Sequence, residues 1–383
     1  MLRTVLRLLL VGAAVVLPIL LAACGGTSAP VQTHATATPT ASVTVSVFAR
    51  GLNNPRGLTF GPDGTLYVAE GGLGGTTSTT SAQCSQVPPP VGPYKGGMSA
   101  RISKISPAGT VSTIVDHLPS NQTSQASGSL VSGVADIQFI DGTLYGLEAG
   151  AGCSHGLVGT NNTLFRVNAN GTTATVVNLS NFLKTHPVKA PNPGDFEPDG
   201  TWYNMVQVQG SLYAIEPNHG ELDKIEPGGQ ISRVADISAS RGHIVPTAVT
   251  YHDGNFYVGS LGTFPIKPGT ENIYKITPSG SLQVAASGLT TVVGVQFDSQ
   301  GHMFALETDT TPGQPGPTAA GSGKVVCVKG NGTLSTVASG LTFPTALTFG
   351  PDGKLYVSNN GFGIPKPGAG QIVRIDPGGS SCA

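Results

Sequence analysis

GLNNPRGLTFGPDGTLYVAE, residues 51–70, decides the fold, and a near copy, SGLTFPTALTFGPDGKLYVSNN, occupies residues 339–360. Each is a short apolar strand, a turn built on Pro-Asp-Gly and a second apolar strand that ends in a carboxylate or an amide. Pro presets its own backbone torsion, Asp bonds to nearby backbone and Gly tolerates positive φ, so the three residues suit a tight reversal. Four weaker copies make six hairpins in all: GVADIQFIDGTLYGLE, NMVQVQGSLYAIE, TAVTYHDGNFYVGS and VGVQFDSQGHMFALE.

A third and a fourth short strand follow each hairpin, as in NIYKITPSG and LQVAAS. Four short strands per unit, repeated at roughly 45 to 80 residues, are typical of a β-propeller. The last unit has no room for its fourth strand, because the chain ends in GGSSCA after residues 371–375, whereas residues 43–50 form a strand with no hairpin before it. We therefore predict an all-β, six-bladed β-propeller over residues 42–383, whose blade 6 is closed by the N-terminal strand. Such closure removes exposed sheet edges.

The composition agrees with this fold and excludes some partners. The chain has 54 Gly among 383 residues and only 11% charged residues, as expected of an all-β protein with many turns. A formal net charge of −1 gives no basic surface for nucleic acid. We expect a monomer that binds no nucleic acid.

The first residues form a targeting segment. Arg3 and Arg7 precede an apolar run, residues 8–20, that is too short to span a bilayer comfortably. The following Leu-Ala-Ala-Cys at residues 21–24 resembles the bacterial lipoprotein signal motif; the alternative is an ordinary signal peptide with a chance Cys. The resemblance implies that residues 1–23 are removed, that Cys24 is lipidated, and that the exported protein is anchored to a membrane without a spanning helix. Residues 24–41 are rich in Thr, Ala, Ser and Pro and are expected to form a flexible tether.

Four cysteines remain beyond Cys24. In an exported protein an even number predicts disulfides, and four cysteines allow three connectivities. Cys84 and Cys153 both follow the second strand of consecutive units, and Cys327 and Cys382 belong to units five and six. We favour the pairs Cys84–Cys153 and Cys327–Cys382; the alternative is unpaired thiols in the core.

The pattern P-x-G-L-T-F-G-P-D-G-x-L-Y-V resembles the NHL repeat and the six-bladed propellers that include the SMP-30/gluconolactonase enzymes. More specifically, the mature domain resembles the ScyD/ScyE family through NNPRGLTFGPDGTLYVAEGG and the segments 217–225 and 245–269. That resemblance implies the fold, in a family without a settled biochemical activity. The SMP-30 resemblance implies a divalent cation held by Glu, Asn and Asp of the channel and an acidic base that opens a lactone. The chain lacks that group's opening Glu-Gly-Pro and mid-chain Asn-Asp-Gly segments.

Superposition of the hairpins places one residue per blade in the same register: Glu70, Glu148, Glu216, Ser260, Glu307 and Asn359. We expect these residues to ring the mouth of the central channel on the face that we call the top. Converging carboxylates repel one another unless they are protonated, hydrated or bridged by a cation. Oxygen ligands suit Ca²⁺, so we predict a Ca²⁺ site at Glu70, Glu148, Glu216, Glu307 and Asn359. Asn360, Asn204 and Asp136 lie near the same mouth. The alternative is that the end-of-strand acids are solvated or bond to backbone amides in the loops between blades.

Two further residues are candidates at this mouth. Arg56 begins the innermost strand of blade 1, where it is expected to pair with Glu70 or Glu307 or to bind an anionic ligand; we favour the ion pair. His219 follows Glu216 on a short top loop, where it is a candidate for metal binding or proton transfer. A hydrogen bond that stabilises the loop is the favoured alternative for His219.

The long connections all lie on the expected top face: residues 71–99, 120–130, 149–161, 184–200 and 308–322. Variable loops above a rigid scaffold are the usual arrangement of a binding face. Trp202 and Tyr203 enter from this side, and core packing is the favoured interpretation. We predict a scaffold that binds a small molecule or a protein through its top face. The enzymatic alternatives are a metal-dependent lactonase and a quinone-dependent sugar dehydrogenase, which the first hairpin also resembles.

Overall fold

Each sequence hairpin folds into the first two strands of an antiparallel sheet. The structure, a computed structural model, describes residues 43–382 except 314–318, 364–365 and 378–381. The predicted signal peptide, the lipidation site Cys24 and the tether lie outside the described residues.

The six sheets follow one another along the chain, and within each blade the strands are ordered from the innermost to the outermost. Blade 1 contains β2 (Pro55–Phe60), β3 (Leu66–Glu70), β4 (Lys95–Ile105), β5 (Val111–Gln122) and the short β6 (Val131–Ser132). Blade 2 contains β7 (Val134–Ile140), β8 (Thr143–Glu148), β9 (Thr163–Val167) and β10 (Thr173–Asn178). Blade 3 contains β11 (Asn204–Val208), β12 (Ser211–Glu216), β13 (Glu221–Ile225) and β14 (Ile231–Asp236).

The second half of the ring repeats this order. Blade 4 contains β15 (Pro246–His252), β16 (Asn255–Ser260), β17 (Glu271–Ile276) and β18 (Leu282–Leu289). Blade 5 contains β19 (Val292–Phe297), β20 (Met303–Glu307), β21 (Gly323–Val328) and β22 (Leu334–Leu341). Blade 6 contains β23 (Ala346–Phe349), β24 (Leu355–Asn359), β25 (Gly370–Asp376) and, outermost, β1 (Thr44–Leu52).

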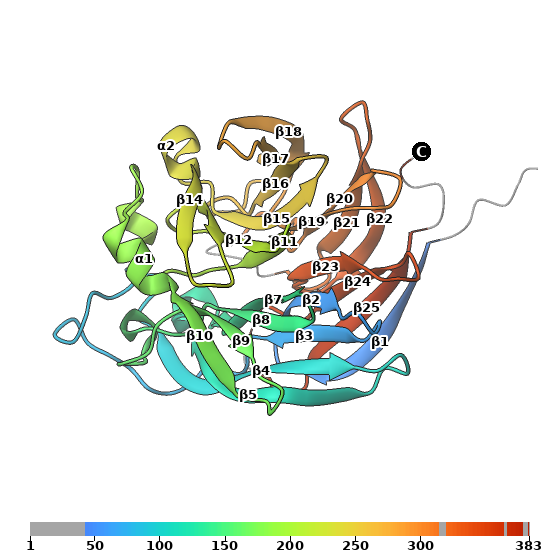
Figure 1. Ribbon diagram of the computed structural model, residues 1–383. Helices are drawn as coiled ribbons and strands as arrows, with labels where there is room; N and C mark the ends of the chain where they lie inside the picture. Colours follow the sequence, from blue (N-terminus) through green and yellow to red (C-terminus); the bar gives the residue numbers. More distant parts are fainter. Residues whose placement is uncertain (1–42, 314–318, 364–365, 378–381, 383) are drawn as a thin grey trace, which may run out of the picture. The chain divides into compact units, whose positions relative to one another are not determined.

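The blades form a closed ring. The innermost strand of each blade contacts that of the next, from β2 through β7, β11, β15 and β19 to β23, and β23 contacts β2 (Figure 1). The predicted six-bladed β-propeller is thus confirmed.

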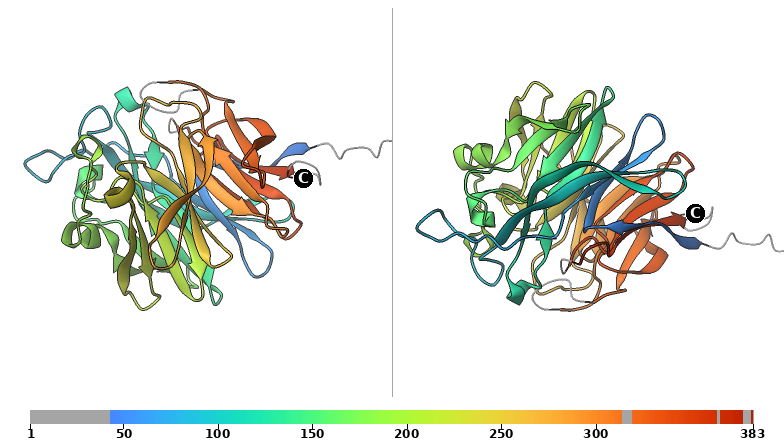
Figure 2. Two further views of the ribbon diagram at one scale, coloured as in Figure 1. Left: turned by 90° about the horizontal axis from the view of Figure 1, so that it is seen from above. Right: turned by 90° about the horizontal axis from the view of Figure 1, so that it is seen from below.

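The N-terminal strand closes the ring, also as predicted. β1 pairs antiparallel with β25, with Val45 opposite Ile375 and Val47 opposite Val373. Both views of Figure 2 show this blue strand beside the red strands of the C-terminal blade. At its end, Leu52 is fully buried in a core cluster shared with blade 1.

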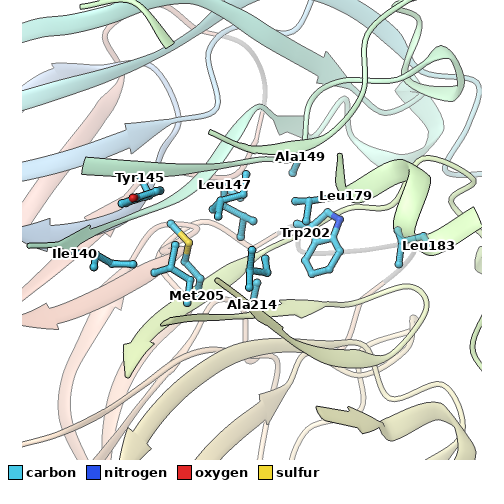
Figure 3. Packing of buried hydrophobic residues seen from close by; sticks show 13 residues of the cluster. Ile140, Tyr145, Leu147, Ala149, Leu179, Leu183, Trp202, Met205 and Ala214 are labelled. Carbon is cyan, nitrogen blue, oxygen red and sulfur yellow. The ribbon is translucent and has the colours of Figure 1, made fainter. Parts of the chain in front are cut away.

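The apolar faces of the blades are covered by their neighbours. Trp202 is fully buried between blades 2 and 3, in one cluster with Leu147, Leu179 and Leu183 (Figure 3). Core packing is therefore the role of Trp202, and the half-buried Tyr203 packs against the core clusters of blades 3 and 4 and of blades 5 and 6.

Helices occur only in short connections of the described chain: α1 (Leu179–Thr185), α2 (Ile237–Arg241) and the 3₁₀ turns η1 (Gln125–Ser127), η2 (Cys153–His155) and η3 (Pro193–Asp195). Among the described residues, none of these helices has the length and apolar character needed to cross a membrane.

Both favoured disulfides are present. Cys84–Cys153 joins the long insertion after β3 to the top connection of blade 2, and Cys327–Cys382 joins β21 to the C-terminal segment. The first disulfide fastens two of the insertions that build the top face.

Candidate ligand-binding site

The six residues aligned by register do occupy equivalent positions. Each is the last residue of the second strand of its blade, and the side chain of each is buried: Glu70, Glu148, Glu216, Ser260, Glu307 and Asn359. Their partners, however, are local.

The carboxylates bind the loops that lead into their own blades. Glu70 accepts hydrogen bonds from the backbone N–H of Asn53 and the hydroxyl of Ser103, both at 2.5 Å, and pairs with Arg101 at 2.8 Å. Glu307 accepts from the backbone N–H of Thr290 at 2.5 Å and pairs with Lys324 at 3.0 Å.

Two of the other members follow the same rule, and two bind elsewhere in their own blades. Glu216 accepts from the backbone N–H of Thr201 at 2.7 Å, and Asn359 accepts from that of Thr342 at 2.7 Å. Glu148 accepts from the N–H groups of the two residues that follow it, and the hydroxyl of Ser260 donates to Glu271 at 2.7 Å. Bonding to backbone amides between blades, the alternative that we named to a shared cation, is therefore seen for Glu70, Glu216, Glu307 and Asn359, whereas Glu148 and Ser260 bond within their own blades.

The expected convergence on one axis is not found. Glu70, Glu216, Glu307 and Asn359 turn toward the loops before the innermost strands. The described part of the chain contains no group of three or more His, Cys, Asp and Glu residues arranged to hold a metal ion. Glu70, Glu216 and Glu307 already accept from N–H donors, and Glu70 and Glu307 also pair with bases, whereas the buried Oε2 of Glu148 has no hydrogen-bond partner among the described residues. The Ca²⁺ ion expected at the mouth stays a prediction, and no chemistry is derived from one.

The residues near the mouth link the innermost strands instead. Asn204 donates to Asp136 at 2.6 Å and accepts from the backbone N–H of Val249 at 2.7 Å, which ties blades 2, 3 and 4 together. Asn360 donates to the carbonyl of Ala369 at 3.2 Å. Both are structural contacts.

Arg56 does not form the ion pair that we favoured, because Glu70 and Glu307 are held by Arg101 and Lys324. Its side chain is buried, with 3% of the residue exposed, and its guanidinium carbon lies over the ring of Tyr203 at 4.6 Å and that of Phe362 at 5.5 Å. Nη1 of Arg56 has no hydrogen-bond partner among the described residues. The guanidinium of Arg56 thus contacts two aromatic rings, while its Nη1 has no hydrogen-bond acceptor among the described residues.

Tyr203 spans the mouth of the channel. It precedes β11 of blade 3, and its hydroxyl donates to the carbonyl of Thr345, just before β23 of blade 6, at 3.2 Å. The ring of Tyr203 therefore forms part of the floor of the channel mouth, next to the guanidinium of Arg56.

A cavity of about 460 Å³ opens above this floor. The top loops of blades 1, 3, 4 and 6 supply its walls. Its polar and aromatic lining includes Arg56, Tyr94, Glu197, Tyr203, His243 and Phe362. Its apolar lining includes Val91, Leu130, Val245, Leu261 and Phe264.

A buried hydrogen-bond chain supports one wall of the cavity. The hydroxyl of Tyr94 donates to Glu197 at 2.5 Å, and the other oxygen of Glu197 lies 2.9 Å from Nε2 of His155. Burial disfavours charge on both partners, but their mutual hydrogen bond and attraction prevail, so the pKa of His155 is raised and that of Glu197 is lowered. Burial, followed by the charge of Glu197, raises the pKa of Tyr94 well above its ordinary value. Tyr94 stays a neutral donor.

Two histidines stand near the same wall. His219 binds the carbonyl of Glu197 through Nε2 at 3.1 Å, which is the loop-stabilising hydrogen bond that we favoured. Nε2 of His243 lies 2.8 Å from Asp195. Asp195 and Glu197 are therefore both partnered.

Comparisons with known proteins agree on the architecture. No protein-family model matches the chain, and no curated protein matches it. A putative oxidoreductase (glucose dehydrogenase) from Thermus thermophilus is similar in structure, with 16% identity over 88% of this chain and 100% of that one, and a TM-score of 0.54. A luciferin-regenerating enzyme shares 9% identity over 87% and 95% of the two chains, with a TM-score of 0.50. A putative gluconolactonase shares 14% identity over 88% and 92%, with a TM-score of 0.49.

The chain is a six-bladed β-propeller. Its neighbours in structure include the putative glucose dehydrogenase and the luciferin-regenerating enzyme. At such low identity the likeness shows the fold of the propeller and not its activity.

Several residues of this cavity were not singled out from the propeller's sequence: Tyr94, Asp195, Glu197, His243 and Phe362. The available signal was the position of the long connections, since residues 71–99 carry Tyr94 and residues 184–200 carry both acids. Phe362 carried no signal in the repeat pattern, because it lies beyond the end of its hairpin.

Proposed function

We propose that the protein is an exported, lipid-anchored propeller that binds a small molecule in the top-face cavity. The observation that carries the proposal is the cavity itself, whose volume of about 460 Å³ lies within the range of small-molecule sites. Its lining also has the usual composition of such sites: mostly apolar walls with a few polar groups that fix orientation. A concave site of this kind favours a small molecule over a protein partner.

The two disulfides support the exported setting, because disulfides persist in oxidising compartments. The lipid anchor rests on the sequence motif that ends at Cys24. Metabolic labelling with palmitate tests it: label should enter the wild-type protein and be absent from Cys24→Ser, and label retained in the variant would contradict the anchor.

Neither enzymatic alternative is proposed. Glu70 and Glu307, two of the acids expected to hold the cation of a metal-dependent lactonase, are engaged within their blades, and the described residues include no group of three or more His, Cys, Asp and Glu arranged to hold a metal ion.

Binding in the cavity is tested by blocking it. Thr263 is an exposed residue of the cavity lining, so Thr263→Trp places a large ring at the entrance. Thr110→Trp, on an exposed turn away from the cavity lining, is the matched control. We expect ligand-observed NMR with a panel of sugars, small organic acids and their neutral amides to detect binding to wild type and Thr110→Trp and to lose it with Thr263→Trp. Equal binding by all three proteins would contradict the proposal.

A further inference from the structure

The guanidinium of Arg56 is a buried donor group that lacks an acceptor. Burying a polar group without a hydrogen bond costs free energy, and burying a charge costs more, so such groups are nearly always partnered. Arg56 is 3% exposed, and its Nη1 has no partner among the described residues. Nη1 itself is enclosed, but Arg56 lines the cavity, so the cavity is the side from which a ligand approaches its guanidinium.

The nearest carboxylate does not supply that acceptor. Asp136 interacts with Arg56 electrostatically, but its oxygens accept from the backbone N–H groups of Ile137 and Met205, both at 2.8 Å, and from Asn204 at 2.6 Å. These hydrogen bonds make Asp136 a structural link between blades 2 and 3. An acceptor for the guanidinium of Arg56 therefore has to come from another group.

Two aromatic rings line the guanidinium of Arg56. Tyr203 and Phe362 make cation–π contacts with it at 4.6 Å and 5.5 Å and supply no acceptor oxygen to its N–H groups. The N–H groups of a guanidinium lie in its plane. A planar fork of donors matches a carboxylate, which accepts two parallel hydrogen bonds.

The charges of the cavity favour a single negative charge on the ligand. Arg56 is the one arginine or lysine among the described residues of the lining, and the other charged groups are Asp195, Glu197 and His243. Asp195 is paired with His243, and Glu197 is bonded to Tyr94 and His155. Those acids would repel a phosphate dianion more strongly than a carboxylate.

Resting on the proposed function, we infer that the ligand is a small organic acid. Its carboxylate binds the edge of the Arg56 guanidinium between Tyr203 and Phe362, and its apolar body lies against the walls formed by Leu130, Val245 and Leu261.

The test compares acids with their uncharged amides: benzoate with benzamide, cinnamate with cinnamamide, and hexanoate with hexanamide. Each pair has the same skeleton and differs at the carboxylate. We expect the acids to bind wild type with dissociation constants about 10- to 100-fold below those of the amides, as measured by titration in ligand-observed NMR or calorimetry. In Arg56→Met, which keeps a long side chain between the rings and removes the donors, this preference should disappear. In the control Arg166→Met, an exposed base on β9, it should persist.

The outcomes separate this inference from the proposed function. Amides that bind as tightly as acids, with binding lost in Thr263→Trp, would leave the cavity as a binding site and overturn the carboxylate. An acid preference that survives in folded Arg56→Met would also overturn it. No binding by either set would overturn the carboxylate ligand, and failure of the sugars to bind as well would overturn the proposed function. Should Arg56→Met fail to fold, the acid–amide comparison on wild type still decides, and Phe362→Leu, which removes one stacking face and keeps the donors, should weaken acid binding about threefold to tenfold.

Discussion

The guanidinium carbon of Arg56 lies 4.6 Å from the centre of the Tyr203 ring, and the hydroxyl of Tyr203 reaches across to the carbonyl of Thr345 in blade 6 at 3.2 Å. A cation of blade 1 and a ring of blade 3 thus meet at the mouth of the channel, with no acid of the six-residue register between them. The guanidinium of Arg56, which contacts aromatic rings and lacks a full set of acceptors among the described residues, thus occupies the mouth of the channel. Loss of this cation should raise the stability of the ligand-free protein and abolish its preference for acids.

Replacement of Arg56 should stabilise the ligand-free protein. Arg56→Met removes a buried charge whose Nη1 has no hydrogen-bond partner among the described residues, and it retains apolar contact with both rings. We expect the free energy of unfolding, measured by urea denaturation, to rise by about 1 kcal/mol. The control is Arg101→Met, which removes the partner of the buried Glu70 and should lower the same quantity by about 1–2 kcal/mol. Destabilisation of Arg56→Met as large as that of Arg101→Met would contradict the prediction.

The sequence predicted where the strand-end residues lie along the chain better than where their side chains point. The six hairpin repeats located the last residue of every second strand, since period-2 patterns and turn residues fix strand ends. The missing fourth strand of the last unit located the closing strand β1. Whether the side chain of Glu70 points to the channel or to Asn53 depends on the path of the loop between β1 and β2. That path is set by tertiary contacts, which the repeat does not encode.

The sequence predicted which face of the propeller carries the candidate site, but not the residues that form the cavity. Loop lengths indicated the top, but Glu197 reaches His155 and Tyr94 because three insertions from different blades pack together. The sequence separation of 42 residues between His155 and Glu197 leaves no local pattern to detect. Arg56 was identified as a candidate, whereas its assignment to an ion pair failed because Arg101 and Lys324 lie nearer to the acids.

Closure of the ring by β1 should be essential to stability. Leu52 is fully buried in a cluster with residues of blades 1 and 6, so Leu52→Ala should lower the free energy of unfolding by about 2–4 kcal/mol. Val45 lies on the same strand with 47% of its surface exposed. Val45→Ala should change the free energy by less than about 0.5 kcal/mol. A small effect at Leu52, measured by thermal or urea unfolding, would show that the remaining strands of blade 6 hold the ring without it.

The hydrogen bond between His155 and Glu197, which supports one wall of the cavity, should make the stability of the protein depend on pH. Burial lowers the pKa of His155, but the hydrogen bond and the charge of Glu197 outweigh it and leave the pKa above the ordinary value of 6.5. A base whose pKa is raised by folding contributes stability that is complete below the unfolded value and is lost as the pH rises through the folded value. We expect the free energy of unfolding of wild type to fall as the pH rises above about 6.5, and His155→Gln to lack this component.

The control for this profile is His302→Gln, on the partly exposed turn before β20, in which the fall should persist. A parallel profile in His155→Gln and wild type would assign the pH dependence to other groups. Tyr94→Phe provides a second check: it removes one hydrogen bond to Glu197 and retains the His155 pair, so the fall should be preserved.

A buried carboxyl pair in blade 3 should produce a second, separable pH dependence. Asp223 is fully buried, and both of its oxygens lack a hydrogen-bond partner among the described residues, as does Oε1 of Glu221. Burial, followed by the charge of Glu221, raises the pKa of Asp223 well above its ordinary value, and burial raises that of Glu221 to about 7. An acid whose pKa is raised by folding binds its proton more tightly in the folded state, so the stability it contributes is lost as the pH rises toward the folded pKa.

Asp223→Asn should relieve that loss. The new amide carries no proton to lose and can donate to Oε1 of Glu221, so the variant should exceed wild type in free energy of unfolding by about 1 kcal/mol at about pH 8. At about pH 5, where the wild-type pair is already protonated, the difference should shrink. Asp116→Asn, on exposed β5, is the control and should change stability by less than about 0.5 kcal/mol at both pH values. An equal loss of stability in Asp223→Asn at both pH values would mean that the carboxylate makes a stabilising contact in its ionised form, which its unpartnered oxygens argue against.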